Sequence, residues 1–260
     1  MKRIVPLLIF LLSVLSCNKA EQAAGGKDMA FVSIRAFETR SKIGTNALPA
    51  WSEGDRISIV GDLSDAPAEF TLHSGAGYSS ASFEGVKPEG NMFMAYYPSS
   101  ARCDGITWRG LLSTRIRHSM PSQSIGTLPL WGRGKDIASL EVSAVCGILR
   151  LDLQGSGKLD HIILEAGRPI SGEYLVSIAD GIFAIINGSN IIWVDAPETV
   201  LMPLKATPFY FILPPAQYED LKFTVVPAEG AAKEYILPGE TLVEAGVFTC
   251  VSSDNLELND

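Results

Sequence analysis

The 260-residue sequence has few of the residues from which metal and catalytic sites are built. Its three histidines, His73, His118 and His161, lie far apart, and none has a second histidine, a cysteine or grouped carboxylates at ligand spacing. The sequence therefore gives no support for a zinc site. It also has no GxSxG motif and no cysteine with a histidine nearby. We expect a protein that is not an enzyme and that uses no cofactor and no metal.

Cysteines and clusters of basic residues are also scarce. Beyond Cys17, the only cysteines are Cys103, Cys146 and Cys250, an odd number at wide spacing without a CxxC pair. This pattern favours free buried thiols over a disulfide framework, although export through an oxidising compartment would permit a Cys146–Cys250 bridge. The net charge is −8, and lysine and arginine are scattered. We expect no nucleic-acid partner, because a surface that binds phosphates needs clustered Lys and Arg. The sequence also has no phosphate-binding loop, so we expect no nucleotide ligand.

Long apolar runs are missing except at the start of the chain. Lys2 and Arg3 precede an apolar stretch over residues 4–12, which is too short to span a bilayer and is typical of a secretory signal. The tetrapeptide Val14-Leu15-Ser16-Cys17 that follows resembles the bacterial lipobox. Residues 1–17 are therefore predicted to be a lipoprotein signal whose Cys17 is lipidated, for example with palmitate. The alternative is an ordinary signal peptide with an incidental cysteine.

The residues after Cys17 bear on localisation. Asn18 occupies the position at which some bacteria sort lipoproteins, and Asn there favours the outer membrane. Residues 18–28 are polar, rich in Ala and Gly and without periodicity, so they are predicted to be a flexible tether. We expect the mature protein to be held on the outer membrane by lipid, because several acyl chains give a stable anchor.

What the sequence does contain is two-residue alternation of apolar side chains. Short alternating runs such as residues 30–37, 147–153 and 209–213 are separated by Gly, Pro, Asn and Asp, which is typical of antiparallel sheets. Residues 120–136 show no clear period and carry two Pro and three Gly, so we expect a long loop or linker there. The sequence thus predicts two β domains, over residues 29–138 and 139–260.

Several ordered motifs resemble the fimbrillin-like proteins of type V pili. After the lipobox come an apolar strand ending in Thr39-Arg40, a W-x-x-G-D-x-I segment from Trp51, and the AYYP motif from Ala95. Pro121-Ser122-Gln123 matches the P-x-Q segment that precedes the second domain of these proteins. The resemblance implies an all-β fold with two tandem antiparallel β-sandwich domains of transthyretin-like type.

The resemblance also implies an assembly mechanism. An arginine-specific protease cuts after the first strand, and a strand from a neighbouring pilus subunit fills the groove that is left. In this chain the removable strand is residues 30–37, with Val32 and Ile34 as strand-exchange residues, and the scissile bond is Arg40-Ser41. The alternative is that Arg40 is a surface residue in an uncut loop.

These observations lead to two hypotheses on function. The first is a structural or accessory lipoprotein of a type V pilus or adhesin, located at the outer membrane and assembled by strand exchange. A role as anchor, tip or accessory protein is as compatible as a stalk role, because residues 253–260 are too short and polar for an obvious spare donor strand. The second is a surface carbohydrate-binding module that stacks sugars on Trp51, Trp108, Trp131 or Trp193.

Overall fold

The computed structural model describes residues 27–39, 49–99, 102–103, 105–118, 128–253 and 257–259. These residues form strands and the short 3-10 helix η1 (Ile137–Ser139), so the all-β class predicted from the alternation is confirmed. No helix in this part of the chain is long and apolar enough to cross a membrane. The strands are β1 (Asp28–Ile34), β2 (Glu38–Thr39), β3 (Arg56–Gly61), β4 (Ala68–Ser74), β5 (Ser80–Gly85), β6 (Phe93–Tyr97), β7 (Arg102–Cys103), β8 (Thr107–Leu112), β9 (Arg115–Arg117), β10 (Leu130–Gly134), β11 (Leu140–Ala144), β12 (Gly147–Leu153), β13 (Gly157–Glu165), β14 (Ser171–Ser177), β15 (Phe183–Ser189), β16 (Ile191–Asp195), β17 (Val200–Leu201), β18 (Thr207–Leu213), β19 (Ala216–Pro227), β20 (Lys233–Val243), β21 (Val247–Ser252) and β22 (Glu257–Asn259).

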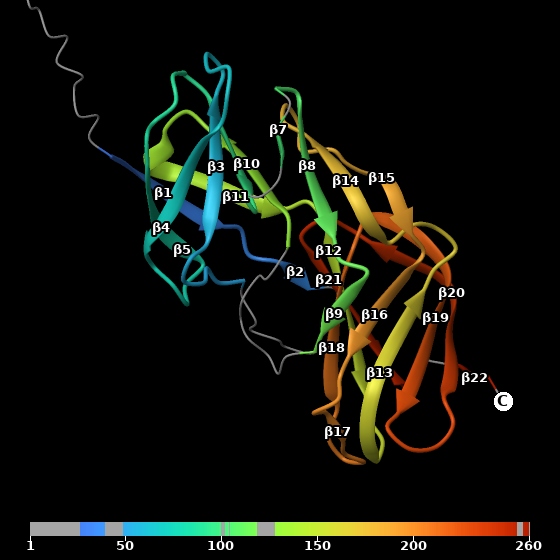
Figure 1. The fold of residues 1–260 in the computed structure, drawn as a ribbon. Coiled ribbons are helices and arrows are strands. Elements are labelled where there is room, and N and C mark those ends of the chain that lie inside the picture. Colours follow the sequence, from blue (N-terminus) through green and yellow to red (C-terminus); the bar gives the residue numbers. More distant parts are fainter. Residues whose placement is uncertain are drawn as a thin grey trace, which may run out of the picture.

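Seven strands form a closed barrel at one end of the molecule, in the order β1-β11-β10-β6-β3-β4-β5 (Figure 1). The ring closes because β1 has a partner on each edge, with β5 antiparallel and β11 parallel to it. The sequence predicted a β-sandwich here; the strand pairing closes into a ring, and the sandwich arrangement stays a prediction. Closure leaves no long open strand edge in the ring, which is a common solution to the edge problem of all-β proteins.

The motif that begins at Trp51 and the AYYP motif are joined inside the barrel by one carboxylate. The Asp55 Oδ2 atom accepts a hydrogen bond from the Ser52 backbone N–H at 2.7 Å, which stabilises the turn at Gly54. The other oxygen, Oδ1, accepts the hydroxyl of Tyr97 at 3.0 Å. The Trp51 ring packs edge-on against the Tyr97 ring, with centroids 5.6 Å apart. These motifs are therefore part of the barrel's own support.

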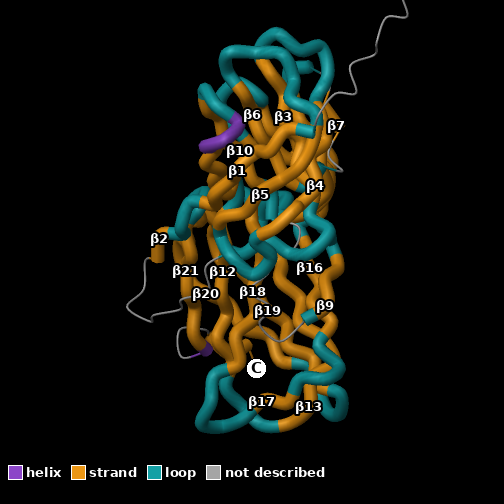
Figure 2. The backbone as a smooth tube through the Cα atoms, turned by 90° about the vertical axis from the view of Figure 1, so that its left-hand side faces the viewer, coloured by secondary structure: helices purple, strands orange, loops and turns teal. Residues whose placement is uncertain are grey.

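The remaining strands form three sheets, called here the C-terminal sheets. Their orders are β18-β12-β21-β2, β22-β20-β19-β13-β16-β9 with β17 beside β13, and β15-β14-β8-β7. The first two of these sheets enclose a second core, which includes Leu149 and Leu151 of β12 and Phe209 and Phe211 of β18, all buried. The sheet of β14 and β8 packs against the barrel core instead. In Figure 2 the barrel occupies one end of the molecule and the long strands β13, β19 and β20 extend toward the other.

The predicted linker over residues 120–136 contains a strand. Residues 119–127 lie outside the described residues, but β10 (Leu130–Gly134) pairs with β6 on one side and β11 on the other. A Cβ atom on Gly132 would lie 2.0 Å from the Glu141 carbonyl oxygen. The glycine that suggested a loop is thus required by the close approach of two strands. The expectation of a loop is wrong for residues 130–134.

The pairing also bears on the expected division at residues 138 and 139. That division separates β10 from β11, which pair within one barrel. In addition, β8 and β9 from the first half of the chain belong to the C-terminal sheets, where β8 pairs with β14 and β9 with β16. The chain therefore crosses between the barrel and the C-terminal sheets several times. The transthyretin-like arrangement of two sandwiches remains a prediction.

Aromatic side chains join the barrel to the C-terminal sheets at a contact called here the seam, formed by Tyr96, Trp108 and Tyr174. The Trp108 ring of β8 lies 4.9 Å from the Tyr96 ring of the barrel and 6.0 Å from the Tyr174 ring of β14. All three side chains are buried. A Cβ atom on Gly110 would lie 2.1 Å from the Tyr174 hydroxyl oxygen, so the glycine makes room for this ring.

Candidate strand-exchange site

The first strand of the barrel is the element on which strand exchange depends. Ala30, Val32 and Ile34 of β1 point into the barrel core and are 0%, 0% and 6% exposed, whereas Met29 and Phe31 on the other face are 44% and 46% exposed. This two-residue alternation fixes the register of the strand, because a slip by one residue would turn all the core side chains outward. Burial of Val32 and Ile34 contributes about 1.5–3 kcal/mol for each side chain.

Both edges of β1 are hydrogen-bonded. Along β5 the pairing runs from Asp28 opposite Gly85 to Ser33 opposite Ser80. Along β11 it runs from Val32 opposite Leu140 to Ile34 opposite Val142. Beyond the strand, the Arg35 N–H donates to the Val142 carbonyl at 2.8 Å. Removal of β1 would therefore expose the backbone groups of two neighbouring strands at once.

An ion pair lies at each end of β1. The Lys27 ammonium is 3.2 Å from Oε2 of Glu84 on β5. The Arg35 guanidinium makes two hydrogen bonds to Glu141 on β11, with Nη2–Oε2 and Nε–Oε1 distances of 2.8 and 3.3 Å. Hydrogen bonding to Arg35 lowers the pKa of the Glu141 carboxyl. The side chains in both pairs are partly exposed, so each pair adds little to stability.

After Arg35 the chain leaves the barrel and reaches the C-terminal sheets. The Phe37 ring packs against Phe248 of β21, with centroids 4.9 Å apart. β2 then pairs in parallel with the start of β21, Glu38 opposite Val247 and Thr39 opposite Phe248. The segment over residues 27–39, called here the leading segment, thus contacts both parts of the molecule (Figure 1).

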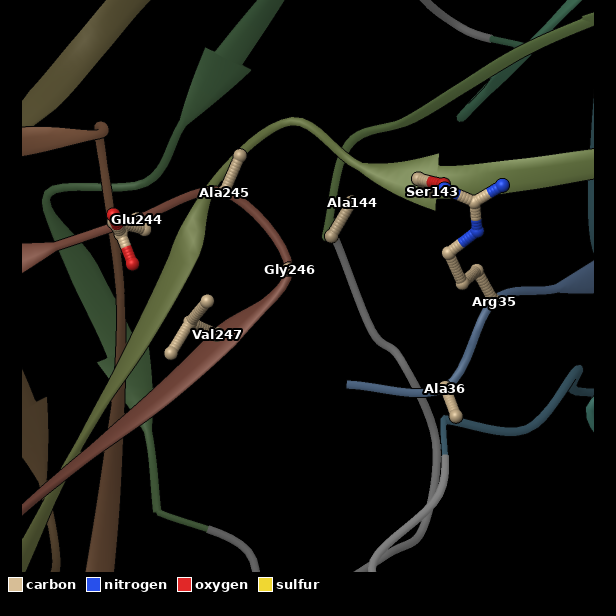
Figure 3. Close-up of a pocket in the computed structure, with 8 residues that line it drawn as sticks. All are labelled: Arg35, Ala36, Ser143, Ala144, Glu244, Ala245, Gly246 and Val247. Atoms are coloured by element: carbon tan, nitrogen blue, oxygen red, sulfur yellow. The ribbon is translucent and has the colours of Figure 1, made fainter. Parts of the chain in front are cut away.

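A cavity of about 350 Å³ lies where the leading segment crosses. It is lined by residues 35–36 of the leading segment, residues 143–144 at the end of β11, and residues 244–247 in the turn from β20 to β21. Figure 3 shows Arg35 and Ser143 on one side of this space and Glu244 and Val247 on the other. Departure of the leading segment would remove one wall of the cavity.

The residues predicted from the sequence fall into two groups. Val32 and Ile34 lie in the barrel core as inward-facing residues of one strand. Cys17, Arg40 and Ser41 lie outside the described residues. The strand expected over residues 30–37 begins earlier and ends earlier, at Asp28 and Ile34, because Arg35 leaves the barrel after its backbone bond to Val142.

Other candidate chemistry is not supported in the described part of the chain. No group of three or more metal-ligating side chains comes together there. Cys146 and Cys250 are free and form no bridge; Cys146 is buried as expected, whereas Cys250 is only partly buried. His118 packs on Phe209 with centroids 4.4 Å apart, and burial lowers the pKa of its imidazole.

The tryptophans do not form the exposed row that a sugar-binding surface needs. Trp51 and Trp108 are 1% and 0% exposed. Trp131 is partly buried, and its indole N–H donates to the Ile178 carbonyl at 3.0 Å. The Trp193 ring packs at a tilt against His161, with centroids 4.9 Å apart. Each indole thus has a packing role, which counts against the carbohydrate-binding hypothesis.

Sequence reasoning missed the ion pairs at the ends of β1. Arg35 and Glu141 are 106 residues apart in the chain, and Lys27 and Glu84 are 57 apart. No local pattern could connect them, since each partner is a single charge on an ordinary strand face. Only the closure of the barrel brings them together.

Comparison with known proteins identifies the fold. No protein-family model matches the sequence, and no curated protein does so. A solved structure of a proposed cell adhesion protein from Bacteroides ovatus has a TM-score of 0.58 and 13% identity, over 90% of this chain and 95% of that chain. A proposed cell adhesion protein from Bacteroides fragilis has a TM-score of 0.48 and 9% identity, over 90% and 97%. The tip fimbrial protein Mfa3 from Porphyromonas gingivalis has a TM-score of 0.40 and 10% identity, over 89% and 98%. The chain thus shares its fold with the protein from B. ovatus.

Proposed function

We propose that this chain is a fimbrillin-like surface lipoprotein, a structural or accessory component of a type V pilus or adhesin, that assembles by protease-triggered strand exchange. The observation that carries the proposal is β1, an N-terminal strand that completes the barrel core and has a strand on each side. The fold shared with a proposed cell adhesion protein supports the same function.

In the proposed mechanism, cleavage of the Arg40-Ser41 bond detaches the leading segment from the rest of the chain. When β1 leaves, the edges of β5 and β11 lose their backbone partners, and the space held by Val32 and Ile34 becomes available. An open edge of this kind accepts an extended strand, whose main chain supplies hydrogen bonds and whose alternate side chains fill the pockets. The incoming strand belongs to another pilus subunit.

The proposal includes the location of the protein. Lipid on Cys17 holds the precursor at the outer membrane, and the residues between Cys17 and Lys27 space the barrel from it. The tether predicted over residues 18–28 is shorter at its end, because Lys27 pairs with Glu84 and Asp28 begins β1. A static adhesin that keeps its leading segment is the second candidate. The contacts beyond the barrel favour it, because Phe37 packs on Phe248 and β2 pairs with β21, which holds the segment at a second place.

A strand-replacement experiment tests the proposal. A site-specific protease sequence placed between Arg40 and Ser41 allows the intact protein to be nicked, so that the leading segment is held without a covalent link. A labelled peptide of residues 27–39 should then enter the nicked protein and not the uncut protein. The same peptide with Val32→Asp and Ile34→Asp should fail to enter, because burial of an unpaired charge costs several kcal/mol.

Fluorescence of the protein band after gel filtration measures entry of the peptide. A matched peptide with the exposed residues changed, Met29→Gln and Phe31→Gln, should enter nearly as well as the parent. If the parent peptide does not enter the nicked protein, the strand-exchange proposal fails and the static adhesin is the better account.

A further inference from the structure

The strands beside β1 each hold a carboxylate that pairs with a cation of the leading segment. Glu84 of β5 lies 3.2 Å from Lys27 at one end of the strand. Glu141 of β11 holds Arg35 at the other end through two hydrogen bonds. Both glutamates belong to strands that stay in the barrel when β1 departs. The vacated groove would therefore carry one negative charge near each end.

The two cations have a fixed relation to the core residues between them. Lys27 and Arg35 are eight positions apart, which is about 26 Å in an extended strand at about 3.3 Å per residue. Ala30, Val32 and Ile34 lie between them and face inward. These side chains are small or β-branched, so a donor with bulkier side chains at these positions would overpack the barrel core. Charge and pocket size together describe the kind of strand that fits.

We propose that the groove left by β1 selects a donor strand that carries a basic residue at each end, eight positions apart, around three inward-facing apolar residues that are small or β-branched. This inference rests on the proposed function and specifies the partner of the same site.

The same charges disfavour one donor, which is the last part of a second copy of this chain. Residues 234–260 contain no Lys or Arg and include Asp254, Glu257 and Asp260. In addition, β22 (Glu257–Asn259) is paired with β20 in its own molecule. A strand from this segment would bring negative charge to the acidic ends of the groove. The donor is therefore a basic-flanked strand and not this segment of a second copy.

The expected size of the effect follows from the exposure of the pairs. A partly exposed ion pair changes affinity only severalfold, and charge reversal adds repulsion at both ends. We expect the peptide of residues 27–39 with Lys27→Glu and Arg35→Glu to enter the nicked protein about tenfold less well than the parent in dilute buffer. The difference should shrink to about twofold at high salt, because the charges are then screened.

The decisive experiment reverses the charges on the protein. In nicked protein with Glu84→Lys and Glu141→Lys, the order of the two peptides should invert. Nicked protein with Glu198→Lys and Glu229→Lys has the same change in net charge at exposed positions of the C-terminal sheets, and it should keep the original order. A labelled peptide of residues 247–260 should enter none of the proteins with the acidic groove.

The outcomes separate this inference from the proposed function. If the parent and charge-reversed peptides enter equally well, or the order does not invert, charge selection is refuted while strand exchange stands. Entry of the 247–260 peptide as readily as the parent also refutes it. If no peptide enters the nicked protein, strand exchange itself fails and the inference fails with it.

Discussion

At the residue scale, Asp55 connects two parts of the barrel that are far apart in the sequence. Its two carboxylate oxygens accept from the Ser52 N–H and the Tyr97 hydroxyl, so one side chain connects the turn before β3 with the end of β6. Burial first, and the charge of Asp55 next, raise the pKa of the Tyr97 phenol above its ordinary value of 10.0. Burial also raises the pKa of Tyr174 and Tyr218.

These raised pKa values predict a loss of stability at alkaline pH. Above pH 10 the unfolded chain releases phenol protons that the folded protein retains. The stabilisation of the folded protein by these phenols is therefore complete below pH 10 and is lost as the pH rises. The free energy of unfolding should fall by as much as about 1.4 kcal/mol per pH unit for each such phenol. Urea unfolding between pH 8 and 11 measures this slope.

Tyr97→Phe isolates one of these contributions. The variant lacks the hydrogen bond to Asp55, so its free energy of unfolding at neutral pH should be about 1 kcal/mol lower than that of the parent. The fall of this free energy with pH above 10 should be shallower than in the parent. Tyr78→Phe is the matched control, because Tyr78 is 71% exposed, and it should change neither quantity. An unchanged slope in the Tyr97 variant would show that this phenol does not carry the effect.

Some of this residue-scale detail could be predicted from the sequence. The Trp51 and AYYP motifs were recognisable as ordered pieces. Their connection through the Asp55 carboxylate was not predictable, because Asp55 and Tyr97 are 42 residues apart and meet only when β3 and β6 pair.

At the scale of elements, two-residue alternation located strands correctly, whereas glycine wrongly indicated a loop where β10 lies. β1 and β12 were visible as alternating runs, and both are strands. β10 was not visible, because its sequence Leu-Trp-Gly-Arg-Gly has the composition of a loop. Gly132 is there for the close approach of β11, and a contact between strands leaves no local signal in the sequence.

Substitution of Gly132 tests this reading of β10. Gly132→Ala should destabilise the protein by about 1–3 kcal/mol, because the added Cβ would lie 2.0 Å from the Glu141 carbonyl oxygen and the strands would have to separate. Gly167→Ala is the control, since nothing lies within 4 Å of its added Cβ. Thermal unfolding of both variants provides the comparison, and equal stability would contradict the proposed close approach.

At the scale of the whole molecule, the chain crosses repeatedly between its two parts. The barrel requires β11, and the C-terminal sheets require β8 and β9 from the earlier half of the chain. Such long-range pairing was not predictable, because sequence patterns indicate strands and not their neighbours. The expected division at residue 138 cuts through this arrangement.

Fragments test the consequence of this topology. A fragment of residues 18–138 lacks β11 and should not form the barrel, since β1 and β10 would each lose a neighbour. Extension to residue 145 restores β11 and should restore dispersed methyl signals in NMR spectra. Equal dispersion in the two fragments would show that the barrel does not depend on β11, and would favour the division at 138.

Membrane attachment is a second property of the whole molecule. Replacement of Cys17 by Ser should move the protein from the outer-membrane fraction to a soluble fraction, because the anchor is proposed to be lipid on this residue alone. Immunoblots of the two fractions after a salt wash measure the shift. Retention of the Cys17→Ser protein in the membrane fraction would overturn the lipoprotein proposal, and Cys250→Ser serves as the control.

The position of β1 between two strands also has a mechanical consequence. The strand runs from the point where the chain enters the barrel toward the C-terminal sheets (Figure 1). A force applied to the chain ahead of Lys27 and borne by those sheets acts along the strand axis. This direction is nearly perpendicular to the hydrogen bonds that join β1 to β5 and at a slant to those that join it to β11. Many bonds then share the load at once. A strand held in this way resists a steady pull along its axis, yet it yields to a competing strand that replaces its hydrogen bonds one pair at a time.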